Sequence, residues 1–306
     1  MANAFGTLST GVVVQRALEL VFQKFPVLGS ISMDLSDQAV DFNQTVYSRK
    51  LTVPSVSTFG SAAADITETD VSVAISNHVQ IRHTVPVASY SGTKRNLIDE
   101  QALPLATSIG SYMTAQIAAL WTNANYTGQE TAATAFPTAS TWNYNACTVL
   151  RSTLNGRGVP MDYRFIAVDS TRFASLLQDP ALAYSYANPT DGAVIRTGVL
   201  TNVAGFQIFE YPAIPSTGTS SGVKWGVAAT KDSTVYAARV QKDPRDILAG
   251  APFPGAYGVV TNPQSGLSVL VTEWIDPATM DANIRLSWMY GVAVGNSNNL
   301  QIVKSL

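Results

Sequence analysis

The longest regular pattern in the chain is a strict alternation of apolar and polar residues between positions 70 and 86. One face of this segment carries the apolar residues Val71, Val73, Ile75, Val79, Ile81 and Val85. A period of two is typical of a β-strand, and about 15 residues far exceed the mean strand of about 5 to 6. The pattern predicts one continuous strand about 50 Å long, at ~3.3 Å per residue.

A shorter alternating segment precedes it, from Thr45 to Val53, and ends at Pro54. The residues between the two segments are rich in Ser, Ala, Gly and Thr and show no period. We therefore expect a long two-stranded arm with a flexible tip, which needs a surface to lie on because isolated hairpins are marginally stable. The apolar face could bury itself on a neighbouring molecule or on the chain's own body. The alternative is one globular sheet interrupted by a loop.

Two segments have helical periodicity. Apolar residues recur every three or four positions between Gly11 and Phe25, and Pro26 ends that pattern. A second stripe predicts a helix from Pro104 to Asn125, about 33 Å long, with Pro104 in its first turn.

The remainder alternates helices and strands and predicts a mixed α+β fold. Helices are expected over 142–154 and 170–177, the second capped by Asp169 or Ser170. Strands are expected over 163–168, 205–211, 223–230, 267–273, 284–294 and 300–303, with a linker over 212–222. Residues 231–240 fit either a short helix or a strand.

Charged residues are unusually scarce. They make up 13% of the chain, against about 25% in an ordinary soluble domain, while the hydrophobic fraction of 46% is normal. Interfaces between proteins are depleted in Lys, Glu and Asp, so much of this surface is expected to face other protein. A net charge of −2 gives no basic footprint for tight nucleic-acid binding. No apolar run is long enough to span a membrane, and the N-terminal residues lack the layout of a secretory signal.

Catalytic and metal-binding patterns are weak. Residues 218–222 match the G-x-S-x-G nucleophile elbow, but that motif needs a strand before it and a helix after it. His78 and His83 are five residues apart on a predicted strand and point to opposite faces. Cys147, the single cysteine, is expected to be a buried thiol. We expect no enzyme activity, no cofactor and no metal site.

The order of these elements resembles that of the Hong Kong 97-type major capsid proteins of tailed phages, most closely the podovirus branch. Four stretches carry the resemblance: VVVQRALELVFQKFP at 12–26, SYMTAQIAALW at 111–121, VAGF at 203–206 and WMYGV at 288–292. The resemblance implies an N-terminal arm over 1–38 and an extended loop over 39–92. It also implies a peripheral domain with a spine helix over 93–141 and 262–306, and an axial domain over 142–261. The inserted β domain and the long N-terminal extension of some members are missing, which implies a separate scaffolding protein or none.

The same resemblance implies a major capsid protein that assembles into hexamers and pentamers of an icosahedral head around double-stranded DNA. The implied location is the virion capsid, assembled in the host cytoplasm, with a portal and with scaffolding and decoration proteins as further partners, and no membrane. The extended loop would form the assembly interface through Arg49, Lys50, Phe59, Asp65, Glu68, Asp70, Val71, Val73 and Ile75. The alternatives are an encapsulin-like nanocompartment shell and a soluble ligand-binding protein.

Overall fold

The computed structural model describes residues 10–51, 68–86, 97–130, 142–183, 202–211, 214, 218–219, 222–242 and 255–305. The chain forms two compact units. The first comprises Met1–Phe25, Met33–Tyr112 and Tyr236–Ala293, and the second comprises Pro26–Ser32, Met113–Val235 and Val294–Leu306. The four-part division implied by the resemblance stays a prediction.

The first unit contains a six-stranded sheet. Its strands follow the order β1 (Ser32–Val40), β10 (Thr234–Gln241), β13 (Ala282–Val294), β12 (Ser268–Ile275) and β11 (Gly255–Thr261), and β4 (Asn77–Val85) also pairs with β13. The strands expected near 267–273 and 284–294 are confirmed as β12 and β13. The sequence patterns missed β1 and β11. Residues 231–240 form a short 3-10 turn, η4 (Lys231–Ser233), followed by β10, so the strand alternative is correct.

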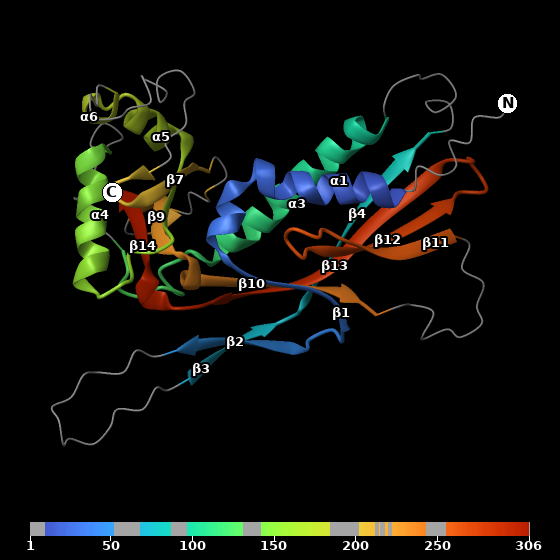
Figure 1. The fold of residues 1–306 in the computed structure, drawn as a ribbon, viewed down its shortest axis with the longest axis horizontal. Coiled ribbons are helices and arrows are strands. Elements are labelled where there is room, and N and C mark those ends of the chain that lie inside the picture. Colours follow the sequence, from blue (N-terminus) through green and yellow to red (C-terminus); the bar gives the residue numbers. More distant parts are fainter. Residues whose placement is uncertain are drawn as a thin grey trace. The chain divides into compact units, whose positions relative to one another are not determined.

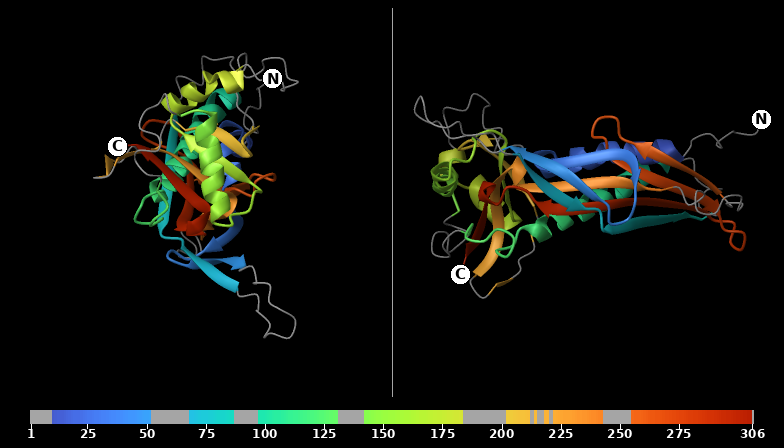
Figure 2. Two further views of the ribbon diagram at one scale, coloured as in Figure 1. Left: turned by 90° about the vertical axis from the view of Figure 1, so that its left-hand side faces the viewer. Right: turned by 90° about the horizontal axis from the view of Figure 1, so that it is seen from below.

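Register assigns the side chains of this sheet to two faces. Trp288 lies opposite Val79 and Leu286 opposite Ile81, so these residues share one face. The helices α1 (Thr10–Lys24) and α3 (Leu97–Leu120) lie above the sheet on this side (Figure 1). Tyr112 of α3 packs edge-on against Trp288 at 6.3 Å between ring centres. In the view from below, the strands of this sheet lie in front of α1 and α3 (Figure 2, right).

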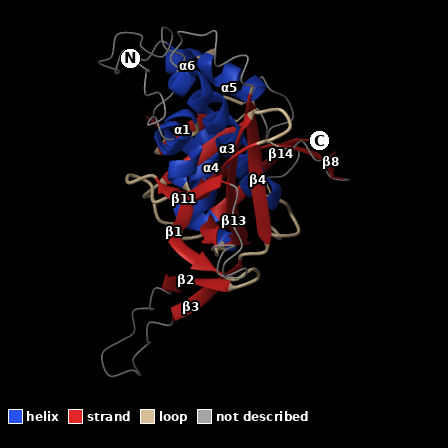
Figure 3. Ribbon diagram, turned by 90° about the vertical axis from the view of Figure 1, so that its right-hand side faces the viewer, coloured by secondary structure: helices blue, strands red, loops and turns tan. Residues whose placement is uncertain are grey.

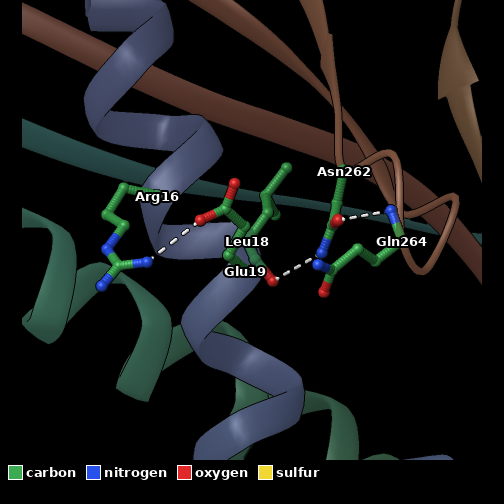
Figure 4. A network of polar contacts seen from close by, with 5 residues as sticks. All are labelled: Arg16, Leu18, Glu19, Asn262 and Gln264. Carbon is green, nitrogen blue, oxygen red and sulfur yellow. Dashed lines mark hydrogen bonds and ion pairs between the residues drawn. The ribbon is translucent and has the colours of Figure 1, made fainter.

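Helix α1 is confirmed close to its predicted bounds and is held by the turn that follows β11. The buried Asn262 side-chain amide donates to the Leu18 carbonyl at 3.0 Å, and its oxygen accepts from the Gln264 backbone N–H at 2.9 Å (Figure 4). Arg16 and Glu19 form a 3.1 Å ion pair on the exposed side of the helix. The Asn262 side chain thus links α1 to the turn that follows β11.

The single strand predicted over 70–86 is wrong, because the chain changes partners at Ile75. β3 (Glu68–Ala74) pairs with β2 (Thr45–Leu51), whereas β4 pairs with β13. Between them, the Ile75 N–H donates to the Gln44 carbonyl, and the Asn43 N–H donates to the Ile75 carbonyl, both at 2.9 Å. The alternation of exposure nevertheless continues through both strands.

The predicted bounds of the long helix are also wrong. α3 begins at Leu97, so Pro104 lies inside the helix, about two turns from its start. A proline there removes only one backbone hydrogen bond, and Leu105, Ala106 and Ile109 bury the same face regardless. The helix ends at Leu120, where the Asn125 side-chain amide donates to the Leu120 carbonyl at 2.8 Å.

The second unit contains another six-stranded sheet. Its order is β14 (Leu300–Ser305), β9 (Gly222–Thr230), β5 (Arg164–Val168), β7 (Phe206–Glu210) and β6 (Asn202–Val203), with β8 (Gly218–Thr219) also on β9. The accompanying helices are α4 (Tyr144–Gly156), α5 (Ser170–Leu177) and the short α6 (Pro180–Ala183). Asp169 caps α5 by accepting from the Arg172 N–H at 2.9 Å, as predicted. Short 3-10 turns occur at η2 (Pro26–Ser30) and η5 (Ser297–Asn299).

The core of the second unit lies between α4, α5 and the sheet. Trp142 and Trp225 meet edge-on at 5.6 Å between ring centres, and the Arg172 guanidinium lies 4.2 Å from the centre of the Trp225 ring. Gly226 permits close packing, because a Cβ at this position would lie 2.9 Å from the Ala167 carbonyl oxygen. β9, which carries Trp225 and Gly226, thus packs closely between β14 and β5 in the interior of the sheet.

Candidate functional site

β2 and β3 form a two-stranded ribbon separate from the six-stranded sheet of the first unit (Figure 3). This confirms the predicted pairing of two neighbouring segments. The register places Arg49 opposite Asp70, Lys50 opposite Thr69 and Leu51 opposite Glu68. Opposite charges directly across an antiparallel ladder stabilise it modestly, so the register favours the Arg49 and Asp70 positions as a pair.

The two faces of the ribbon differ in exposure. Tyr47 is 64% exposed, and its cross-strand partner Ser72 is exposed as well. Asp70 is exposed on the same face, whereas Val46 and Val71 on the other face are half-buried. The ribbon therefore presents one open face carrying an aromatic ring and a carboxylate.

The base of the ribbon is buried within the first unit. Val73 and Ile75 are 1% and 0% exposed. Gly291 of β13 is tightly packed against this base, because a Cβ there would lie 3.0 Å from Val73 Cγ1. Of the two sites considered for the apolar face, the chain's own body is therefore correct for Val73 and Ile75. These two residues anchor the ribbon and are not available to a neighbour.

The other predicted interface residues are described in part or not at all. Phe59 and Asp65 lie outside the described residues, as does the predicted tip between them. Arg49, Lys50 and Glu68 have a backbone position and a register only. Their roles in assembly, like those of Asp70 and Val71, stay predictions.

Exposed apolar residues mark further surfaces that the sequence patterns did not single out. In the first unit they gather near the β12–β13 turn, where Ile275 and Met280 are 60% and 63% exposed. In the second unit, Met161 and Tyr163 precede β5, and Tyr163 is 77% exposed with a φ of 55°. That backbone conformation is unfavourable for an aromatic residue, so surrounding contacts must impose it.

Arg164 supplies those contacts. Its side chain is buried, and Nε donates to the Pro160 carbonyl at 2.8 Å while Nη2 donates to the Val159 carbonyl at 2.5 Å. Its guanidinium also lies 6.0 Å from the centre of the Phe206 ring. Burial lowers the pKa of Arg164, with a smaller contribution from Arg151. The buried Arg164 side chain therefore fixes the backbone of the loop that exposes Met161 and Tyr163.

Other buried cations also serve the fold. Lys224 donates to the Trp121 carbonyl at 2.6 Å and to the Ala118 carbonyl at 3.3 Å, at the C-terminal end of α3. Burial lowers the pKa of Lys224 to about 8. The positive charge suits the negative end of the helix dipole. Lys304 forms an ion pair with Glu130 in the same unit.

The described residues do not assemble a recognisable catalytic centre. The described residues of the G-x-S-x-G sequence are Gly218 and Thr219, which pair with Val223 and Gly222, so a strand and not a helix follows the motif. His78 is exposed on β4, and burial raises the pKa of the Cys147 thiol to about 12. No cluster of three or more His, Cys, Asp or Glu suited to a metal occurs among the described residues. None of the described helices combines the length and apolar character needed to cross a bilayer.

Comparison with known proteins identifies the fold. No family model matches the sequence, and no curated protein matches it either. Among solved structures, the capsid structure of the cyanophage P-SCSP1u aligns with a TM-score of 0.56 at 12% identity, covering 90% of this chain and 86% of that one.

Two further solved structures also align with most of the chain. A structure from Mycobacterium phage Che8 aligns with a TM-score of 0.53 at 16% identity, covering 85% of this chain and 84% of that one. The virus-like particle from Pyrococcus furiosus aligns with a TM-score of 0.51 at 10% identity, covering 95% and 97%. The chain has the Hong Kong 97-type capsid fold. The closer resemblance to the podovirus branch stays a prediction.

Proposed function

We propose that this chain is a shell-forming major capsid protein whose copies assemble into hexamers and pentamers of an icosahedral phage head. The observation that carries the proposal is the capsid fold over nearly the whole chain, which aligns with the cyanophage P-SCSP1u capsid structure over 90% of its length and with the structure from Mycobacterium phage Che8 over 85%. The shell would enclose double-stranded DNA without reading its sequence. The protein would be structural, without enzyme activity.

The surface chemistry supports this function. With 13% charged residues, the chain has too little charge for an ordinary soluble surface, whereas a subunit tiled on many edges exposes less surface to water. The slightly negative net charge of −2 suits a wall that encloses DNA without binding it tightly. The open face of the β2–β3 ribbon, with Tyr47 and Asp70, would lie across a neighbouring subunit.

Electron microscopy of the purified full-length chain tests the proposal. We expect closed particles, in which a portal, a scaffolding protein or decoration proteins would be additional components assembled in the host cytoplasm. A chain that stays monomeric at all concentrations would contradict the proposal and favour a soluble binding protein. Closed particles that retain a cargo enzyme and no DNA when purified from infected cells would favour the nanocompartment alternative.

A further inference from the structure

The face of the first sheet opposite α1 and α3 carries an unusual row of residues. The register of β4 and β13 places Arg82 directly opposite Arg285, and Thr84 directly opposite Asn283. On the other side of β13, β12 places Trp274 opposite Asn283. Residues opposite one another in an antiparallel pair share a face, so two arginines and one tryptophan project from the same side.

The two guanidinium groups converge on the tryptophan. Arg82 Cζ lies 5.2 Å from the centre of the Trp274 ring, and Arg285 Cζ lies 5.8 Å from it. Asn283 orients the first arginine, because its Oδ1 accepts from Arg82 Nε at 3.3 Å and from Nη2 at 3.0 Å. Thr84 donates to the same oxygen at 2.8 Å. We call Arg82, Trp274 and Arg285 the arginine–tryptophan site.

The charges of this site are not balanced within the described part of the chain. Like charges directly opposite on a ladder destabilise it, yet neither arginine forms an ion pair with a described residue. Glu273 lies opposite Ile284 and therefore projects from the other face. Arg82 is exposed and Arg285 is half-buried, so an acceptor from another molecule can reach both guanidinium groups. Asn283 accepts only two of the N–H donors of Arg82, which leaves further donors for such an acceptor.

We propose that the arginine–tryptophan site binds a carboxylate of a second copy of this chain, supplied by the acidic segment of its β2–β3 ribbon. Guanidinium groups bind carboxylates with paired hydrogen bonds, and Arg and Trp are enriched among the residues that dominate protein interfaces. The sequence of this segment contains three acidic residues, Asp65, Glu68 and Asp70. Of their side chains only that of Asp70 is described, and it is exposed on the open face of the ribbon, opposite the Arg49 position. This inference rests on the proposed function and names the surface on which the ribbon docks.

A DNA phosphate fits the same chemistry less well. Proteins that bind DNA through phosphates use many cations, and their affinity comes from releasing many counterions. Here two arginines lie on a face whose other exposed β4 residues are His78, Gln80 and Thr84, in a chain with a net charge of −2. A single carboxylate per site satisfies the two guanidinium groups, and the described β4 residues on this face add no further Lys or Arg.

The double variant Arg82→Gln with Arg285→Gln tests the site in the full-length chain. Losing a charged hydrogen-bonded pair at each contact is expected to raise the concentration at which particles form by about tenfold or more. The melting temperature of the unassembled subunit should stay the same or rise, because two like charges are removed.

The matched control is Arg16→Gln with Lys24→Gln on α1, which removes the same charge and should leave particle formation unchanged. Arg82→Lys with Arg285→Lys keeps the charge but loses the planar donors, so it should give an intermediate loss and decides the test if the Gln variant does not fold.

A charge swap identifies the partner. Arg82→Glu with Arg285→Glu should abolish particles, and adding Asp65→Lys, Glu68→Lys and Asp70→Lys to the same chain should restore them at least in part. Wild-type particles that form no more readily than those of the Gln variant would overturn this inference and leave the proposed function intact. Failure of the wild-type chain itself to form particles would contradict the proposed function. Weaker binding of the Gln variant to double-stranded DNA with unchanged assembly would assign the site to phosphate and overturn the inference, as would a swap that restores nothing.

Discussion

Gly291 of β13 lies so close to Ala74 of β3 that a Cβ at position 291 would be 2.2 Å from the Ala74 carbonyl oxygen. That oxygen belongs to rigid backbone at the base of the ribbon. No side chain other than hydrogen can therefore occupy position 291 without displacing the ribbon. This contact determines where the ribbon leaves the sheet of the first unit.

Gly291→Ala is expected to lower the free energy of unfolding by about 1 to 3 kcal/mol, because the overpacked methyl group forces the backbone apart. Gly258→Ala on β11 is the matched control, since a Cβ there meets nothing within 4 Å. Chemical denaturation of both unassembled variants measures the difference. Equal stability of the two variants would contradict the close approach.

The strained backbone at Tyr163 gives a second prediction. A left-handed conformation costs a non-glycine residue about 1 to 2 kcal/mol, and glycine's extra chain entropy costs about 0.5 to 1. Because Tyr163 is 77% exposed and contributes little packing, Tyr163→Gly should leave the free energy of unfolding unchanged or raise it slightly. Ser152→Gly, at an exposed position in the interior of α4, should instead lower it by about 0.5 kcal/mol. A comparable loss at both positions would show that Tyr163 is not strained.

A third prediction concerns alkaline stability. The buried Tyr126 hydroxyl donates to the Ser233 carbonyl at 2.8 Å, and burial raises the pKa of Tyr126 to about 12 from an ordinary value of 10. The unfolded chain therefore ionises first. The stability that depends on neutral Tyr126 is complete below about pH 10 and is lost as the pH rises to about 12.

Tyr126→Phe should cost about 1 kcal/mol at neutral pH through the lost hydrogen bond. Between about pH 10 and pH 12, the wild type should then lose about 2 kcal/mol more than the variant. Denaturant titrations across this range measure both effects. Tyr47→Phe, at an exposed position, is the control, and parallel pH profiles for wild type and Tyr126→Phe would refute the assignment.

Local patterns predicted the elements whose contacts are local. The capped helix at Ser170–Leu177 follows from residues that are near one another in the sequence, as does the pairing of the segment at 45–53 with the first part of the segment at 70–86. The break at Ile75 does not, because the alternation continues through it and only the contacts with Asn43 and Gln44 separate the two strands. The early start of α3 was missed because Pro104 is a typical first-turn residue, whereas the helix begins at Leu97 and already buries Ala102 before the proline.

The arginine–tryptophan site could not be predicted, because it depends on register between distant strands. Arg82 and Arg285 become neighbours only when β4 pairs with β13 in one particular alignment. A shift of one residue would put the two arginines on opposite faces. A useful signal was present in the polar residues at alternate positions of both strands, namely 82 and 84 with 283 and 285, but nothing local aligns them.

The last prediction concerns the segment between the strands of the ribbon. Removing residues 56–67 and joining the ends by a short turn retains the ladder from Thr45 opposite Ala74 to Leu51 opposite Glu68. Because Val73 and Ile75 are buried in the first unit, the subunit should fold with an unchanged melting temperature. Closed shells should not form, since an arm that crosses a neighbour needs its full length.

A variant with the same segment replaced by Gly and Ser residues of equal length distinguishes an effect of the length of the arm from an effect of its side chains. Sedimentation and electron microscopy provide the measurement, and normal shells from the deletion would exclude an assembly role for the segment.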